Sequence, residues 1–442
     1  MYKNIYFIGI GGIGMSAIAR YYNARGFKVS GYDKTPSPLT EKLENEGIEI
    51  HYKDNTAFIP EDVEHTLVVY TPAIPKDMGE LVYVQEHGYR VIKRSRMLGE
   101  ITHGQRCMAV AGTHGKTTTS TLVSHLFTSS GEGCSAFLGG ISKNYDSNLL
   151  ISNNNVVVAE ADEFDRSFLQ LFPEIAVITS MDADHLDIYG DETHIREAFK
   201  AFASQVSGTV IAKYGLDITP DDTKAEIKTY SFGNPQADFY AEALEDGHFD
   251  LHYPGGVIED CVVGIPGWVN IENATGAAAI ALTYGIEPQK IKEALASFRG
   301  VKRRFDIQIK RQDCVYIDDY AHHPEEISAA LSSIRNSYPQ MKLTAVFQPH
   351  LYTRTRDFAP EFAKALSKAD KLILLDIYPA REEPIPGVTS EIIFNDVTCP
   401  EKVLLKRSEL MDYLRKEKVE LLVTLGAGDI DRFTGEIADM LK

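Results

Sequence analysis

The stretch that decides the fold is Met108-Ala-Val-Ala-Gly-Thr-His-Gly-Lys-Thr-Thr119. Apolar residues lead into a glycine turn, Lys116 and Thr117 follow, and apolar residues then recur with helical spacing as far as Phe127. In this order of strand, loop and helix, the loop N–H groups and the helix N-terminus form an anion site. The Lys116 ammonium can reach the β- and γ-phosphates of a nucleotide, and the Thr117 hydroxyl can be a ligand of Mg²⁺. The stretch therefore predicts a phosphate-binding loop.

The spacing of this loop departs from the usual Walker pattern. The early glycine of that pattern falls at Val110, and Gly112 precedes Gly115 by only three residues. The alternative is an ordinary glycine turn before a surface helix. We favour phosphate binding because Gly-Lys-Thr at the start of a helix has a clear mechanism.

Length and composition restrict the class of protein. A chain of 442 residues exceeds what one core usually supports, so two or three domains are expected. The five cysteines are odd in number, lie far apart and form no Cys-x-x-Cys, which favours a reduced cytoplasmic protein without structural zinc. The net charge of −18 argues against broad nucleic-acid binding and means that anionic substrates need locally basic pockets.

The N-terminal segment reads as a Rossmann-type opening. Residues 3–10 predict a buried strand, the glycines of Gly9-x-Gly11-x-x-Gly14 follow, and a helix is expected over Met15–Ala24. A second strand, Lys28–Tyr32, ends on Asp33. The glycines would let the backbone approach a pyrophosphate, and Asp33 could bond a ribose or sugar hydroxyl. The motif alone does not separate NAD from a UDP-sugar, and a simple packing turn is the alternative.

A second loop is expected at the same edge of this sheet. The segment Thr71-Pro-Ala-Ile74 follows a short strand, Leu67–Tyr70. Open α/β sheets bind their ligands at the carboxyl ends of the strands. The polar, turn-like segment His103-Gly-Gln-Arg106 then predicts the first domain boundary.

Acidic residues follow two successive strands of the second domain. Strand Val156–Ala159 ends on Glu160-Ala-Asp-Glu-Phe-Asp165, and strand Ile175–Thr179 precedes Ser180-Met-Asp-Ala-Asp-His-Leu-Asp187. Beside a phosphate loop, such acids are expected to bind Mg²⁺ and water, and His185 is a further candidate contact of the metal or γ-phosphate. A solvated carboxylate is the alternative for each acid alone. Zinc is disfavoured, because no cysteine or second histidine lies close in the sequence.

The junction with a third domain carries amides and cations. Asn270 and Asn273 begin an alanine-rich helix, where they either read adenine or cap the helix, and the sequence does not decide. The segment Gly300-Val-Lys-Arg-Arg-Phe-Asp306 predicts the second boundary. Its three cations are candidates for a phosphate contact, with solvated linker charge as the alternative.

Beyond this junction, four apolar strands each end in a polar loop. This pattern predicts another doubly wound sheet with its ligand edge at those loops. The four strands are Val315–Asp318, Leu343–Phe347, Lys371–Leu375 and Leu421–Leu425.

Together these motifs resemble the Mur ligase family over essentially the whole chain. The short Gly-Thr-x-Gly-Lys-Thr loop is itself the form of this family, which explains the missing Walker glycine. The markers are Gly9–Ser16, Gly112–Thr119, Glu160–Glu163, Asp182–Asp187, Gly300–Phe305, Asp318–Pro324, Phe347–His350, Tyr378–Glu383 and Gly426–Ile430.

The resemblance implies an α/β fold of three domains. These are an N-terminal Rossmann-like UDP-sugar domain (1–104), a central P-loop ATPase domain (105–299) and a C-terminal Rossmann-like domain for the incoming amino acid (300–442). Within the family, the chain is most similar to the branch that adds L-alanine to UDP-N-acetylmuramate. That implies a cytoplasmic bacterial ligase of peptidoglycan synthesis that uses ATP, Mg²⁺ and these two small substrates. No nucleic-acid or membrane partner is expected, and the oligomeric state stays open.

The implied reaction has two steps. A lactyl carboxylate is a poor electrophile, so the γ-phosphoryl of ATP would first convert it to an acyl phosphate, which the amine of alanine attacks. The first step brings anions together and needs cations. The second needs the amine held close and its carboxylate paired.

Family correspondence assigns residues to each part of the site, with His322 and Arg354 holding the alanine carboxylate. The expected catalytic residues are Lys116, His185, Glu160, His322 and Arg354. Those expected to bind ATP are Gly112, Thr113, His114, Gly115, Lys116, Thr117, Thr118, Asn273 and Arg304. Those expected to bind the UDP-sugar are Gly11, Gly12, Ile13, Gly14, Asp33, Thr71, Pro72 and Ala73. The expected metal ligands are Thr117, Glu160 and His185.

Two positions depart from the family pattern. The family often has His where Val269 stands, which weakens the adenine assignment, and Arg where Leu351 stands, which removes one expected cation from the alanine site.

Three other functions remain as alternatives. An NAD-dependent dehydrogenase would explain the first glycine motif but not Lys116 and Thr117. A non-catalytic nucleotide-binding regulator would need no second substrate site. A sister enzyme that recycles a murein tripeptide is the nearest enzymatic rival, and the opening Gly9-Ile-Gly-Gly-Ile-Gly-Met15 argues against it.

Overall fold

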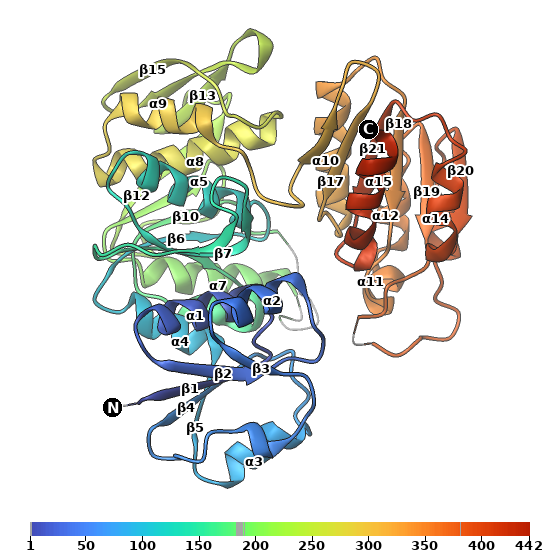
Figure 1. The fold of residues 1–442 in the computed structure, drawn as a ribbon. Coiled ribbons are helices and arrows are strands. Elements are labelled where there is room, and N and C mark those ends of the chain that lie inside the picture. Colours follow the sequence, from blue (N-terminus) through green and yellow to red (C-terminus); the bar gives the residue numbers. More distant parts are fainter. Residues whose placement is uncertain (1, 183–188, 190, 381) are drawn as a thin grey trace. The chain divides into compact units, whose positions relative to one another are not determined.

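The computed structural model describes residues 2–182, 189, 191–380 and 382–442. Within these residues the strands form three sheets (Figure 1). The chain divides into two compact units, the first made of 1–264 and 271–299, the second of 265–270 and 300–442. No helix of the described part is both long enough and apolar enough to cross a membrane.

The first sheet belongs to the first unit and is parallel throughout. In spatial order its strands are β3 (Glu49–His51), β2 (Lys28–Tyr32), β1 (Asn4–Ile8), β4 (Thr66–Tyr70) and β5 (Arg90–Lys93). Its other elements are α1 (Ile13–Ala24), α2 (Pro38–Asn45), the 3₁₀ turn η1 (Thr56–Phe58), α3 (Gly79–Glu86) and α4 (Arg94–Thr102). The strand order reverses between β1 and β4, and open α/β sheets bind their ligands at such a reversal.

The second sheet, also in the first unit, is mixed, with antiparallel pairs at both margins. In spatial order its strands are β15 (Gly256–Cys261), β14 (Phe249–Tyr253), β13 (Phe239–Ala243), β12 (Glu226–Phe232), β11 (Thr209–Lys213), β10 (Pro173–Ile178), β6 (Arg106–Ala111), β9 (Val156–Ala161), β7 (Ser135–Ser142) and β8 (Ser147–Leu150). Its other elements are α5 (Lys116–Ser129), η2 (Phe164–Gln170), α7 (Glu192–Ser204), η3 (Glu245–Gly247), α8 (Trp268–Tyr284) and α9 (Pro288–Ser297). The first three residues of α8 belong to the second unit. Because β10, β6 and β9 are parallel neighbours, the loops that follow them meet at one edge.

The third sheet lies at the centre of the second unit, and among its described strands only the edge strand β16 runs antiparallel to its neighbour. In spatial order its strands are β16 (Asp306–Lys310), β17 (Val315–Asp319), β21 (Leu421–Leu425), β18 (Leu343–Phe347), β19 (Lys371–Leu375) and β20 (Glu401–Leu405). Its helices are α10 (Pro324–Ser337), α11 (Tyr352–Asp357), α12 (Ala359–Leu366), α13 (Glu391–Phe394), α14 (Leu410–Leu414) and α15 (Thr434–Leu441), with turns η4 (Arg407–Glu409) and η5 (Asp429–Phe433). The inner strands are buried along their whole length, as expected of a parallel sheet covered on both faces.

Helix α1 begins at Ile13 rather than Met15, and two further helices also begin earlier than their sequence suggests. Helix α4 begins at Arg94 rather than Met97. Its first turn is polar and partly exposed, so it lacks the apolar residues by which the sequence pattern marks a helix. Helix α8 begins at Trp268, so Asn270 lies inside the helix rather than before it. The Asn270 amide donates to the carbonyl of Pro266 at 2.6 Å, which is a local backbone contact.

Candidate active site

The phosphate loop between β6 and α5 has two glycines in left-handed conformations. Gly112 has φ +139° and Gly115 has φ +80°. A Cβ atom would lie 2.0 Å from the Thr179 Oγ1 at Gly112 and 2.8 Å from the Asn273 Oδ1 at Gly115. Both positions therefore require glycine, and Asn273 of α8 lies against the loop, while its assignment to ATP stays a prediction.

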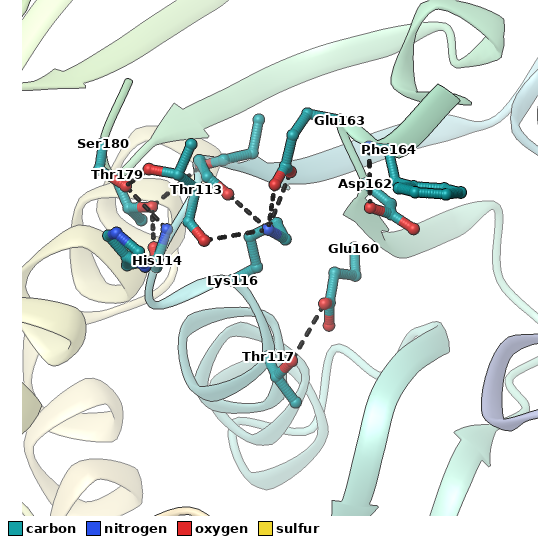
Figure 2. Close-up of polar contacts among 12 residues, drawn as sticks. Thr113, His114, Lys116, Thr117, Glu160, Asp162, Glu163, Phe164, Thr179 and Ser180 are labelled. Carbon is teal, nitrogen blue, oxygen red and sulfur yellow. Dashed lines mark hydrogen bonds and ion pairs between the residues drawn. The ribbon is translucent and has the colours of Figure 1, made fainter. Parts of the chain in front are cut away.

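Lys116 begins α5 and points back into the loop (Figure 2). Its Nζ donates to the carbonyls of Gly112 at 2.7 Å and Thr113 at 3.3 Å, and to the Glu163 Oε1 at 2.9 Å. Burial alone would lower the pKa of Lys116, but nearby carboxylates, Glu163 foremost, outweigh it and raise the pKa. Lys116 is therefore a cation at physiological pH.

The loop after β10 fixes the shape of the phosphate loop (Figure 2). The Thr179 hydroxyl donates to the carbonyl of His114 at 2.5 Å, and the Ser180 Oγ accepts the His114 N–H at 2.8 Å. The Thr113 and Ser180 hydroxyls are 2.8 Å apart. The sequence did not assign Thr179 or Ser180 to the site, although Thr179 ends a predicted strand and Ser180 begins the acidic run that follows it.

Thr117 and Glu160 form a pair of oxygen donors at the start of α5. The Thr117 hydroxyl donates to the Glu160 Oε1 at 3.0 Å, and the Gly139 N–H donates to the Oε2 at 3.0 Å. Adjacent ligands of octahedral Mg²⁺, each about 2.0–2.1 Å from the ion, are about 3 Å apart. The two donors thus have the spacing of adjacent magnesium ligands, and their assignment to the metal stays a prediction.

For the other predicted residues around this loop, the structure gives fewer contacts. Thr118 lies buried in the first turn of α5. His185 lies outside the described residues. The Asp182 N–H donates to the Thr113 Oγ1 at 3.2 Å, so the acidic run begins beside the phosphate loop.

The predicted UDP-sugar residues lie together at the carboxyl edge of the first sheet. The Gly11 N–H donates to the Asp33 Oδ2 at 2.7 Å, which holds the glycine loop against the end of β2. A Cβ on Gly9 would lie 3.3 Å from the Thr71 Cγ2, so the loop after β4 borders the glycine loop. The further members of these loops are Gly12, Ile13 and Gly14 at the start of α1, and Pro72 and Ala73, both exposed.

In the second unit, His322 lies in the loop between β17 and α10. Its Nδ1 is 3.0 Å from the carbonyl of Tyr320 and 3.3 Å from the Glu326 Oε2. Burial lowers the pKa of His322 to about 4, the Glu326 carboxylate opposes the shift, and the Arg354 charge adds to it. The imidazole is therefore neutral at pH 7, and Arg354 is the cation of this pair of predicted residues.

The cations of the segment after Gly300 have different roles. The Arg304 guanidinium lies 5.0 Å from the centre of the Tyr320 ring. The Arg303 Nε is 3.3 Å from the buried Asp318 Oδ2, and its Nη2 donates to the carbonyl of Gly426 at 2.6 Å. Arg303 thus ties the ends of β17 and β21 together, which the sequence did not indicate, whereas Arg304 stays a candidate ATP contact.

Comparison with known proteins identifies the family. Family models match residues 4–106 (Mur ligase family, catalytic domain), 110–281 (Mur ligase middle domain) and 303–430 (Mur ligase, glutamate ligase domain). The UDP-N-acetylmuramate–L-alanine ligase of Parabacteroides distasonis is 52% identical, over 99% of this chain and 97% of its own. The ligase of that name from Porphyromonas gingivalis is 49% identical, over 100% and 99%. The chain belongs to the Mur ligase family.

Solved Mur ligases have the same fold. The UDP-N-acetylmuramate–alanine ligase of Thermotoga maritima superposes with a TM-score of 0.84 at 26% identity, over 99% of each chain. A murein peptide ligase from Psychrobacter arcticus gives 0.74 at 22% identity over 99% and 98%, which speaks for the fold alone. The three-domain α/β fold predicted from the sequence is confirmed. Mur ligases are ATP-dependent ligases, which agrees with the phosphate loop of this Mur ligase.

Proposed function

We propose that this Mur ligase joins L-alanine to the lactyl carboxylate of UDP-N-acetylmuramate, with conversion of ATP to ADP and phosphate. The observation that carries the proposal is the full-length identity of about half with ligases of that name. The reaction would be the first peptide addition of peptidoglycan synthesis, in the bacterial cytoplasm. The proposed division of labour is UDP-sugar binding by 1–104, ATP binding by 105–299 and amino-acid binding by 300–442.

The phosphate loop would hold the nucleotide for phosphoryl transfer. The N–H groups at the start of α5 and the Lys116 ammonium would bind the β- and γ-phosphates. Thr117 and Glu160 would hold Mg²⁺, with His185 proposed as a further contact, and the ion would neutralise the charge that develops on the phosphates. Asn273 and Arg304 would contact the rest of ATP.

The glycine loop and the second unit would bind the two substrates that are joined. Gly11–Gly14, Asp33 and Thr71–Ala73 would bind the nucleotide sugar. Arg354, with the neutral His322 beside it, would pair with the carboxylate of alanine and so place its amine for attack on the acyl phosphate. Exclusion of water would protect that intermediate from hydrolysis.

The test is phosphate release from ATP with UDP-N-acetylmuramate and each of a panel of amino acids. We expect release that requires both substrates and is fastest with L-alanine, with glycine and serine as weak alternatives, because the side chain of alanine offers little apolar contact. Release with a murein tripeptide but not with alanine would assign the chain to the recycling reaction instead. Release independent of any amino acid would remove the proposed ligation.

A further inference from the structure

Arg94, the first residue of α4, lies against the glycine loop of the first sheet. A Cβ atom on Gly14 would be 2.8 Å from the Arg94 Nη1 and 3.5 Å from its Cζ. Gly14 is the second residue of α1, so the guanidinium lies at the N-terminal end of that helix. The third glycine of the motif therefore makes room for this side chain. Arg94 directly follows β5, and Gly14 follows β1, which β4 separates from β5 in the sheet.

The location is electrostatically unfavourable for a cation by itself. A helix N-terminus carries a partial positive charge, and its first N–H groups have no acceptor within the helix. The N-cap residue Gly12 provides no side-chain cap, and the first turn of α1 contains no acid. The guanidinium and these N–H donors thus lie at the same end of α1, and an anion bound there would be attracted to both.

Within the described residues, the carboxylate paired with Arg94 is Asp162. Its Oδ2 lies 3.3 Å from the Arg94 Nη2, with the two side chains 37% and 21% exposed. The Asp162 Oδ1 accepts the Phe164 N–H at 3.1 Å, so the carboxylate is held by its own turn (Figure 2). A pair this exposed adds little to stability, but it aims the guanidinium. Arg94, Asp162 and Glu160 also border one small cavity, which places Arg94 between the glycine loop and the predicted metal ligand.

We propose that Arg94 binds the diphosphate of the nucleotide sugar, together with the N–H groups of α1, and that Asp162 positions it. The planar guanidinium suits phosphate oxygens, to which it can donate two parallel hydrogen bonds. The diphosphate is assigned, rather than the lactyl carboxylate, because Arg94 contacts the glycine loop itself. This inference rests on the proposed function, since it takes a UDP-sugar as the ligand.

The test is direct binding of three ligands without ATP or alanine: UDP-N-acetylmuramate, UDP-N-acetylglucosamine and UDP. We expect Arg94→Ala to raise the Kd of all three by ten- to a hundredfold and to leave the Kd of ATP within twofold. Arg94→Lys keeps the positive charge but loses the paired N–H donors of the guanidinium, so its Kd values should lie between those of the wild type and Arg94→Ala. The matched control is Arg96→Ala, two residues along α4, whose side chain is 59% exposed and pairs with Glu100.

A double-mutant cycle tests the geometry itself. Gly14→Ala should displace the guanidinium and raise the Kd in the wild-type background, but have a smaller effect when Arg94 is already alanine. Asp162→Asn, which removes the aiming charge, should raise the Kd less than Arg94→Ala does. Additive effects of Gly14→Ala and Arg94→Ala would overturn the proposed contact.

The outcomes separate this inference from the proposed function. Wild-type binding of UDP-sugars with unchanged Kd in Arg94→Ala, accompanied by a lower melting temperature, would make Arg94 purely structural and overturn the inference alone. A loss restricted to UDP-N-acetylmuramate would assign Arg94 to the lactyl carboxylate and overturn the diphosphate contact. Absence of UDP-sugar binding by the wild type would overturn both proposals.

Discussion

Lys116 and Glu163 depend on each other at the centre of the phosphate loop. The Glu163 side chain is only 1% exposed, and its Oε2 lies 2.8 Å from the Lys116 Nζ. Removal of one member of a buried ion pair leaves the other as an uncompensated charge. The acid that follows β9 thus acts on the lysine that follows β6, and the pair ties together two loops at one edge of the sheet.

Lys116→Ala should therefore have two separable effects. Turnover should fall by several orders of magnitude, because the phosphates lose their cation. The free energy of unfolding should also fall, by up to about 3–5 kcal/mol, because Glu163 is left buried and charged. The matched variant Lys116→Ala/Glu163→Gln should recover most of the stability and none of the turnover. Near-normal phosphate release in either folded variant would remove Lys116 from the mechanism.

Gly139 of β7 has a role at the metal site that depends on the absence of a side chain. A Cβ there would lie 2.4–2.6 Å from the carboxylate atoms of Glu160. Gly139→Ala should displace Glu160, lower kcat at least tenfold and raise the Mg²⁺ concentration needed for half-maximal rate. Gly435→Ala is the matched control, because a Cβ there meets nothing within 4 Å. An unchanged Mg²⁺ requirement in Gly139→Ala would contradict the assignment of Glu160 as a ligand.

His322 should make stability depend on pH in one window. Its folded-state pKa is about 4, below the value of about 6.5 expected for the unfolded chain. Between these values the unfolded chain binds more protons, so the free energy of unfolding should fall as pH drops from about 6.5 to 4. The measurement is denaturant unfolding of the wild type and His322→Asn across this range. A difference between the two that is independent of pH would show that His322 titrates normally.

At the scale of elements, α11 is the short helix that presents Arg354. It begins after Leu351, whose φ of +71° is unusual for a residue with a side chain. The Thr353 N–H donates to the Glu382 Oε2 at 3.0 Å, which fixes the first turn of the helix. The position where the family often has Arg therefore lies at the bend that precedes the helix of Arg354.

Arg354→Ala should raise the KM for alanine by roughly ten- to a hundredfold, with much smaller effects on the KM for ATP. A charged hydrogen bond to a carboxylate is worth roughly 1.5–3 kcal/mol, and His322 is neutral. Leu351→Arg should lower the KM for alanine or leave it unchanged, depending on whether another cation already serves there. Initial-rate phosphate release measures both constants. A change in the KM for ATP alone would assign Arg354 to the nucleotide site instead of the alanine site.

The helices and strands also show which features of the structure could be predicted from the sequence. Strands such as Leu343–Phe347 and Lys371–Leu375 were predicted with their observed bounds, because apolar runs between turn residues are local signals. The contacts of Gly139, Thr179 and Arg303 were not predicted. Each depends on a partner 21 to 123 residues away in the chain, and no local pattern encodes such a pairing. The family resemblance supplied site residues that spacing alone could not, among them Arg354.

At the scale of the molecule, the chain folds as two compact units. The third sheet has apolar clusters of its own on its two faces, made of residues of the second unit. Predicted sites for the nucleotide sugar lie in the first unit, and His322 and Arg354 in the second. The two units are thus predicted to bind different substrates, and the second unit has apolar clusters of its own.

Calorimetry should detect this division. We expect thermal unfolding to show two transitions, with UDP-N-acetylmuramate raising the midpoint of one of them, because a ligand stabilises the part that binds it. Leu422→Ala creates a cavity in the second unit and should lower the midpoint of the other transition. A single transition shifted equally by both changes would mean that the units unfold together.

The passage of the chain between the units has a consequence for recombination. Residues 265–270 belong to the second unit, although the residues on either side of them, 264 and 271, belong to the first. Within the second unit, Ile265 lies against Gly300, and Gly267 lies near Ser333 of α10. A chimera that exchanges only residues from 300 onward between two relatives would leave this short segment from the wrong parent. The second unit therefore cannot be exchanged at a single junction, and a chimera must replace residues 265–270 together with 300–442.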